Sequence, residues 1–390
     1  MNAPVFLPAM AVATCLGIGK AATMGALLAG DRSGLRRHQG DALPLGRLPT
    51  EPGGHGDSRN NRLLAMLLEE IAEPLARAIE RYGRDRVAVV VGTSTSGIAE
   101  GEVALAQRLK TGHWPAGFTY AQQETGSAAS FIADALGLGG PAYVVGTACS
   151  SSAKVFASAR RLIRQGLADA AIVGGADTLC RLTVAGFSAL EAVAPEPCLP
   201  FSAHRRGITL GEGGALFLLT PEPAEIALLG VGESSDAHHL SAPDPEGHGA
   251  RDAMQAALAD AGLDPRQIGY VNLHGTATQL NDAMEARAVN AVFGPLLPCS
   301  STKALTGHTL GAAGAVEAAL LWLTLSAEWN PSRLLPPQAG TGQMDDSLPP
   351  LHLVAAGEAW PMAEKLAALS SSFAFGGSNC ALVLGRGWGI

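Results

Sequence analysis

The sequence predicts an α/β fold in which helices cover a largely parallel sheet. Short apolar segments rich in Val, Ala and Leu alternate with longer segments whose apolar residues recur at helical spacing. The chain also has 48 glycines among its 390 residues, as expected where many tight turns join closely packed elements. Strands that alternate with helices in this way are typical of parallel sheets connected by crossover helices.

The individual elements follow from local composition. The N-terminal segment 1–17 is apolar, lacks the basic start of a signal peptide and is interrupted by Pro8, so we interpret it as a first strand and turn. Helices are expected where apolar residues recur every three to four positions. The expected strands are 87–92, 142–148, 170–176, 214–220 and 269–275; the expected helices are 59–83, 151–166 and 250–262; and the expected long loops are 38–58 and 330–350.

The length of the chain indicates two similar units. A chain of 390 residues exceeds the size of one simple core. A proline-rich stretch at 220–228 lies near the middle, and strands, long helices and closing strands follow in a similar order on both sides. We therefore predict an N-terminal half, 1–222, and a C-terminal half, 223–390.

Composition argues against several classes of protein. The formal net charge of −8 is unlike that of a dedicated nucleic-acid binder, because neutralising phosphates needs a basic surface. The six cysteines are scattered, with no CxxC pair and no Cys/His spacing of a metal site. Free thiols in a cytoplasmic protein are therefore expected. The longest later apolar run, 318–327, is too short for insertion across a bilayer.

Cys149 is the first candidate for chemistry. The stretch GTACSSS places it between the strand expected at 142–148 and a helix expected to begin near Ser150. Such a strand–turn–helix elbow presents a side chain at the edge of a sheet, and the helix N-terminus favours the thiolate. Taken alone, however, a cysteine in a turn of small residues is more often a packed thiol than a nucleophile.

Two histidines strengthen the catalytic interpretation. His274 ends the strand expected at 269–275, and His308 stands in TGHTLG ahead of an Ala/Gly-rich helix. Each alone is more often structural than catalytic. Because Cys149 also follows a strand, His274 can reach the same edge of the sheet. One thiol with two imidazoles suits thioester chemistry, in which a nucleophile takes an acyl group and N–H donors stabilise developing negative charge.

Two further signals are weaker. Lys303 and Glu317 flank His308 in small and apolar sequence, where charged groups are usually paired, although a surface lysine and a solvated glutamate fit the spacing equally well. The stretch SSSFAFGGSNCALVLG, 370–385, has a double glycine before a strand, and by itself this indicates only a hairpin.

Together, the motifs GTACSSS, HGTATQLNDAMEA, STKALTGHTLGAAGAVE and SFAFGGSN resemble, in order, those of the β-ketoacyl-acyl-carrier-protein synthases, which are elongating condensing enzymes of the thiolase superfamily. The resemblance covers nearly the whole chain. It implies a thiolase-like fold with two similar βαβαβαββ halves in a five-layered αβαβα arrangement. The short spacing between Cys149 and His274, together with the motif GTACSSS, resembles that of synthases for specialised polyene or aryl-polyene lipids.

The resemblance also implies catalytic roles. Cys149 corresponds to the nucleophile that takes the acyl group from the phosphopantetheine arm of an acyl carrier protein. His274 and His308 correspond to the pair that binds the malonyl thioester and stabilises the enolate formed on decarboxylation. The backbone N–H groups of Cys149 and Phe375 correspond to the oxyanion hole, and Phe375 also matches the family's gating phenylalanine.

Other residues are assigned by the same resemblance to binding and support. Thr276 and Thr278 match residues that touch phosphopantetheine, and Lys303 and Glu317 match an ion pair behind the histidines. No bound cofactor or metal is expected, because the substrates arrive on the carrier. Carriers are acidic, as is this chain, so docking would need a local basic patch; the arginines could equally serve pairs within the chain. The candidates for carrier docking are Arg36, Arg37, Arg205 and Arg206.

The activity implied is a decarboxylative Claisen condensation of an acyl chain on Cys149 with malonyl-acyl-carrier protein, in fatty-acid or specialised polyketide synthesis. An alternative is a non-catalytic or co-catalytic subunit similar to the chain-length factors that pair with ketosynthases, although those usually lack the cysteine. A cysteine hydrolase would leave the second histidine without a role. The expected assembly is a homodimer, or a heterodimer with a ketosynthase-like subunit.

Overall fold

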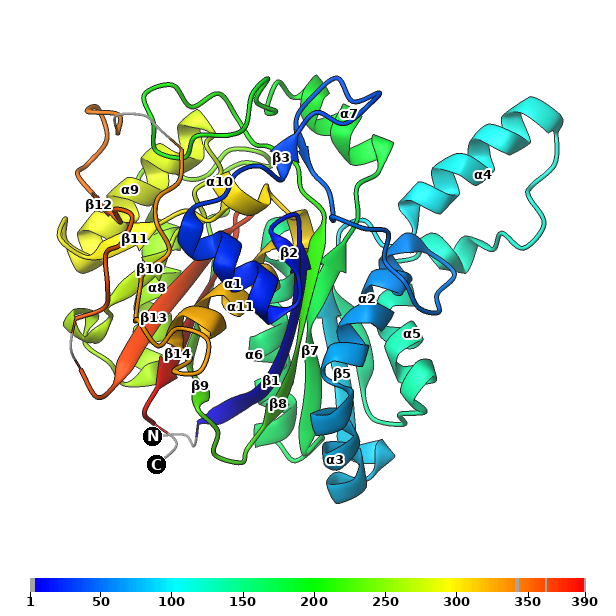
Figure 1. Cartoon of the computed structure of the whole chain (residues 1–390), viewed down its shortest axis with the longest axis horizontal. Helices are drawn as coiled ribbons and strands as arrows, with labels where there is room; N and C mark the ends of the chain where they lie inside the picture. Colours follow the sequence, from blue (N-terminus) through cyan, green and yellow to red (C-terminus); the bar gives the residue numbers. More distant parts are fainter. Residues whose placement is uncertain (1–3, 341–343, 362, 389–390) are drawn as a thin grey trace.

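Two groups of strands form the centre of the molecule in the computed structural model (Figure 1). The structure describes residues 4–340, 344–361 and 363–388. The main strands of the N-terminal half are β1 (Val5–Thr14), β5 (Val87–Gly92), β6 (Ala142–Val145), β7 (Ala170–Asp177) and β8 (Gly213–Thr220); those of the C-terminal half are β9 (Ile226–Ser235), β10 (Tyr270–Asn272), β11 (Pro298–Ser300), β13 (Leu366–Phe373) and β14 (Ser378–Arg386); the short strands are β2 (Gly17–Ile18), β3 (Leu35–Arg36), β4 (Leu45–Gly46) and β12 (His352–Leu353).

The two halves arrange their strands in the same order. The sheet runs β6-β5-β7-β8-β1 in the N-terminal half and β11-β10-β13-β14-β9 in the C-terminal half. The directions of the strands also match. β5 is parallel to β6 and β7, as β10 is to β11 and β13. β8 is antiparallel to β7 and β1, as β14 is to β13 and β9. The ends of β1 and β9 pair with each other and join the two sheets. The predicted division after residue 222 lies in the link between β8 and β9.

Helices lie between the two sheets and on their outer faces (Figure 1). The central pair is formed by the helix that follows β6 and the long helix before β13. The helices are α1 (Lys20–Ala29), α2 (Arg59–Glu70), α3 (Ala72–Tyr82), α4 (Ile98–Thr111), α5 (Ser127–Leu136), α6 (Ser151–Arg164), α7 (Arg181–Ala189), α8 (His248–Ala261), α9 (Gln279–Phe293), α10 (Lys303–Thr306) and α11 (Ala313–Leu325), with 3-10 turns η1 (Arg84–Arg86), η2 (Tyr120–Gln123), η3 (Ala148–Ser150), η4 (Pro265–Gln267) and η5 (Leu310–Ala312).

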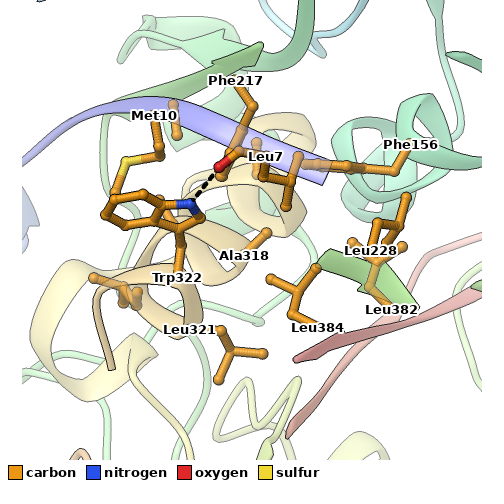
Figure 2. Close-up of a cluster of buried hydrophobic side chains, with 14 of the residues drawn as sticks. Leu7, Met10, Phe156, Phe217, Leu228, Ala318, Leu321, Trp322, Leu382 and Leu384 are labelled. Atoms are coloured by element: carbon orange, nitrogen blue, oxygen red, sulfur yellow. Dashed lines mark hydrogen bonds between the residues drawn. The ribbon is translucent and has the colours of Figure 1, made fainter. Parts of the chain in front are cut away.

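The alternating faces of β1 show how the layers are held. Leu7 and Met10 pack in the central cluster with α6 and α11, where the Trp322 indole N–H donates to the Leu7 carbonyl at 2.9 Å (Figure 2). Ala9 and Ala11 belong to a second cluster with α2 and α5, and a third cluster lies between the C-terminal sheet and the helices α8 and α9. The order helix, sheet, helix, sheet, helix confirms the predicted five-layered αβαβα fold.

The expected helix 59–83 is divided in the structure. α2 ends at Glu70 and α3 begins at Ala72, with Ile71 between them at φ −110° and ψ 14°. The cause is Pro74, which has no N–H to donate to the Glu70 carbonyl and whose ring clashes with it in a continuous helix. The expected strand 142–148 is also shorter, because the chain turns after Val145.

Candidate active site

Cys149 lies on the predicted elbow between β6 and α6. The turn η3 connects the two elements, and its first residue, Ala148, has a φ of 51°. This left-handed conformation is uncommon for a residue with a Cβ and marks a sharp, strained turn. Ser151 Oγ fixes the turn by accepting from the Thr147 N–H at 2.9 Å and donating to the Ala148 carbonyl at 2.6 Å.

The structure brings both predicted histidines to the thiol. His308 Nε2 lies 3.1 Å from Cys149 Sγ. The rings of His274 and His308 are 5.5 Å apart between centroids and nearly perpendicular, at 87°. All three side chains are buried. The N-terminal half thus contributes the thiol, and the C-terminal half contributes both imidazoles.

Burial keeps this group of three residues neutral. It raises the pKa of Cys149 to about 12, against a partial opposing effect of the Lys303 charge. Burial and the same lysine hold the pKa of His308, and likewise that of His274, well below its ordinary value. The helix N-terminus favours the thiolate, but desolvation outweighs that effect, so Cys149 rests as the thiol. The neutral His308 can instead accept the thiol proton.

Lys303 orients His274. Its Nζ lies 3.3 Å from His274 Nδ1 and forms a buried ion pair with Glu317. Since an ammonium group only donates, Nδ1 is the acceptor, and the proton of the neutral His274 ring is on Nε2. Burial raises the pKa of Glu317 to about 7, although Lys303 opposes the shift. Of the two arrangements left open by the sequence, the buried pair is the one formed.

Glu285, on α9, holds the backbone of the His274 loop. Its carboxylate accepts from the N–H groups of His274 and Gly275, each at 2.6 Å, and from Ser371 Oγ at 2.9 Å. Burial raises the pKa of this carboxyl to about 7. We did not predict this residue. The available signal was the pair Asp282 and Glu285, two acids at i, i+3 spacing in the helix that follows His274.

Asp177, at the end of β7, is a second buried carboxylate that we did not predict. It accepts from both the N–H and the hydroxyl of Thr95, each at 2.8 Å, and from Thr93 Oγ1 at 2.6 Å. It also accepts from the Ser94 N–H at 2.8 Å and from the Ala312 N–H at 3.1 Å. The last bond crosses to the turn η5, which follows His308, so Asp177 connects the two halves beside the site.

A cavity of about 360 Å³ leads to Cys149 and both histidines. Thr276 and Thr278 line it, with their hydroxyl oxygens 2.9 Å apart. The Phe375 backbone N–H lies near the Cys149 thiol and partly opposes the rise in its pKa. The Phe375 ring, which is partly exposed, contacts Phe187 at 5.8 Å between centroids. The structure therefore brings the predicted phosphopantetheine and gate residues to the same cavity as the thiol.

The four arginines do not form one patch. Arg206 is exposed at the cavity, but Arg205 is buried, where it pairs with Asp345 and donates to the Ser202 carbonyl at 3.0 Å. Arg37 pairs with Glu196 at 3.1 Å, and Arg36 lines a different cavity. Of the predicted docking residues, Arg206 alone lies at the cavity, and Arg205 serves a pair within the chain.

The described residues contain neither a metal-binding cluster nor a membrane-spanning helix. No three His, Cys, Asp or Glu side chains among residues 4–340, 344–361 and 363–388 are placed to hold a metal ion. Within the same residues, no helix is both long enough and apolar enough to cross a membrane.

Comparison with known proteins agrees with this geometry. Residues 57–224 match the N-terminal domain of β-ketoacyl synthases, and residues 225–335 match the C-terminal domain. Nodulation protein E of Rhizobium meliloti is 36% identical over 76% of this chain and 75% of that protein. The 3-oxoacyl-[acyl-carrier-protein] synthase 2 of Staphylococcus aureus is 33% identical over 77% of each.

Solved structures are similar over almost the whole length. One chain from the complex of a ketosynthase with its chain length factor, from Xenorhabdus doucetiae, superposes with a TM-score of 0.91 at 45% identity, over 98% of both chains. A β-ketoacyl synthase from Burkholderia phymatum gives a TM-score of 0.87 at 28% identity, over 99% of this chain and 100% of that one. With these matches along its length and this fold, the chain belongs to the β-ketoacyl synthase family.

Proposed function

We propose that Cys149 accepts an acyl chain from the phosphopantetheine arm of an acyl carrier protein and then condenses it with malonyl-acyl-carrier protein. The products are a β-ketoacyl-carrier and CO2. The observation that carries this proposal is the buried Cys149 thiol 3.1 Å from His308 Nε2, with a second imidazole, that of His274, beside His308 in the lining of the same cavity. One such pair suffices for acyl transfer, and the second imidazole fits a reaction that also forms an enolate.

In the first step, Cys149 attacks the thioester carbonyl of the acyl carrier. His308 Nε2 accepts the thiol proton as the carbon–sulfur bond forms. The N–H groups of Cys149 and Phe375 stabilise the oxyanion, and preorganised donors of this kind contribute several kcal/mol to such steps. The carrier thiolate then leaves and takes the proton from His308, so that a new thioester on Cys149 replaces the old one.

In the second step, malonyl-carrier loses CO2 and the two electrons of the broken bond form an enolate. His274 presents its Nε2–H to the enolate oxygen, because Lys303 occupies Nδ1. His308 no longer faces a thiol and can carry its proton on Nε2 as a second donor. The enolate carbon attacks the acyl carbonyl, the Cys149 thiolate leaves, and one proton taken up from solvent restores the thiol.

The alternative function, a chain-length-factor-like subunit, is less well supported. Such a subunit needs no nucleophile, whereas this chain keeps a thiol in contact with His308 and an oriented His274. A partner subunit is nevertheless part of the proposal. The helix α4 projects from the body (Figure 1). It exposes Val103 and Leu109, and β6 is the outer strand of its sheet. We propose that a second ketosynthase-fold subunit covers this face; a monomeric mass for the purified chain under native conditions would contradict a homodimer.

Intact-protein mass spectrometry tests the nucleophile. Incubation with a panel of acyl carriers should add one acyl mass to the wild-type chain and none to Cys149→Ala. Cys299→Ala is the matched control, because Cys299 is also buried but does not line the cavity. An acyl adduct that persists on Cys149→Ala would show that a residue other than Cys149 receives the acyl chain.

A further inference from the structure

We propose that the mouth of the active-site cavity is an apolar docking surface, so that the carrier binds it through apolar contact rather than through charge attraction. The inference rests on the proposed function and specifies its partner: an acyl carrier whose surface around the phosphopantetheine attachment is apolar. Four residues define the surface, which we call the mouth rim: Leu190, Leu240, Leu280 and Phe375.

The mouth rim is formed by large apolar side chains that are exposed in the described structure. Leu190 is 59% exposed, Leu280 is 60% exposed and Phe375 is 39% exposed, and all three line the cavity that leads to Cys149. Leu240 is 80% exposed and lies beside them, since its carbonyl accepts from the Gly376 N–H at 2.7 Å. A single exposed leucine needs no explanation, but three leucines and a phenylalanine around one opening form a patch of the kind that marks an interaction site.

Four different segments supply these residues. Leu190 directly follows α7, Leu280 lies in the first turn of α9, and Phe375 lies in the turn between β13 and β14. Leu240 comes from the segment between β9 and α8. Segments so far apart in the sequence surround the opening on several sides. A partner placed over the cavity would therefore contact the mouth rim and not one helix alone.

The charged side chains at the same opening do not attract an acidic partner. Among the described residues that line the cavity, Arg206 is the one permanent cation, and it is accompanied by Glu191 and Asp236. The two histidines are buried and their pKa values are depressed, so they add no positive charge near neutral pH. Long-range attraction of an acidic carrier needs an excess of positive charge, which these residues do not provide.

The position of the cavity indicates which partner binds the mouth rim. Any substrate carried on phosphopantetheine must pass through the mouth rim to reach Cys149, and the arm remains attached to its carrier throughout. The carrier surface next to the arm is thereby held against the mouth rim. A second exposed apolar group, Val103 and Leu109 on α4, belongs to another face and does not line this cavity. The carrier is thus the partner that the mouth rim fits.

The test compares acyl transfer to Cys149 from the acyl carrier and from a small acyl-pantetheine thioester that has no protein attached. The readout is the ratio of two second-order rate constants for acylation of Cys149, that with the acyl carrier divided by that with the acyl-pantetheine thioester, both followed by intact-protein mass spectrometry. The variant is Leu190→Ser with Leu280→Ser. The matched control is Leu296→Ser, because Leu296 is more exposed but lies before β11, away from the cavity.

We expect the ratio to fall about ten-fold in the double variant, as the loss of apolar contact from two leucines implies, and to stay within about two-fold in the control. Raising salt from about 0.1 to 1 M, which shortens the screening length from about 10 to 3 Å, should change the wild-type ratio less than about two-fold. An unchanged ratio in the double variant, or a ten-fold loss in salt, overturns the inference. If neither thioester acylates Cys149, the proposed function fails as well.

Discussion

The two halves of the molecule build the same scaffold but use it differently. In each half a 3-10 turn leads into the central helix, and in each the first residue of that turn has nearly the same positive φ: 51° at Ala148 and 50° at Leu310. The second residue of the turn is Cys149 in one half and Gly311 in the other. The nucleophile and a glycine therefore occupy corresponding positions.

The surroundings of these two positions explain the difference. Cys149 faces the cavity and His308. A Cβ on Gly311 would lie 2.6 Å from Ser94 Oγ and 2.9 Å from Asp177 Oδ2, so this turn is closed against the N-terminal half. One turn is thus open to substrate, and the other fixes the position of His308. The two halves have equivalent elbows, and packing between the halves leaves one of them open for chemistry.

The largest effect on this arrangement is expected from Lys303→Ala. The change leaves Glu317 buried without its partner, and breaking a buried pair in this way typically lowers the free energy of unfolding by about 3–5 kcal/mol. Urea denaturation measures the change. As a control, Lys303→Met combined with Glu317→Met replaces both charges at similar volume, and we expect it to recover much of the stability but not the release of CO2. Equal stability of Lys303→Ala and wild type would contradict the buried pair.

A smaller effect is expected from Gly311→Ala, which tests the closed elbow directly. The added methyl group must displace Ser94 or Asp177, and such overpacking costs about 1–3 kcal/mol. Because η5 follows His308, we also expect CO2 release to fall about ten-fold or more. Gly25→Ala in α1 is the matched control, since a Cβ there meets nothing within 4 Å. If both variants decarboxylate at the wild-type rate, η5 does not position His308.

The next effect concerns pH and Glu285, the carboxylate that supports the His274 loop in the C-terminal half. Burial raises the pKa of Glu285 from 4.5 to about 7, so the native chain binds this proton more tightly than the unfolded chain. The stabilisation is present below the unfolded value and is lost as the pH rises through about 7. We therefore expect Glu285→Gln to flatten the decrease of unfolding free energy between about pH 5 and 7. An identical slope in the variant would contradict this shift.

Much of this fold could be predicted because its signals are local. The strand at 87–92 is an uninterrupted apolar run, and the structure forms it with the same bounds. Cys149 and His308 lie in short sequence patterns that resemble a known family, and the resemblance located them. The break at Ile71 was also readable, since Pro74 prevents a continuous helix, but the apolar spacing of 59–83 was given more weight.

The remaining features depend on contacts between distant residues. Asp177 accepts a hydrogen bond from the N–H of Ala312, which is 135 positions away in the sequence. Nothing in the sequence around either residue indicates this bond. Arg205 was a candidate for carrier docking, with a pair inside the chain equally open, and the sequence did not indicate its partner: Asp345, 140 positions away, pairs with the buried Arg205. The protonation of Cys149 depends on the same kind of contact: the helix N-terminus that favours the thiolate is visible in the sequence, whereas the burial that raises the pKa of the thiol is not.

The central claim is that the N-terminal half supplies acyl transfer through Cys149, while His274 and His308 of the C-terminal half supply decarboxylation. The most direct test uses Cys149→Gln, which removes the nucleophile and leaves both imidazoles. Conversion of malonyl-carrier to acetyl-carrier is followed by intact mass. The account predicts that Cys149→Gln releases CO2 without forming a condensation product, and that adding His274→Ala and His308→Ala abolishes the release. Equal CO2 release with and without the two histidines would contradict it.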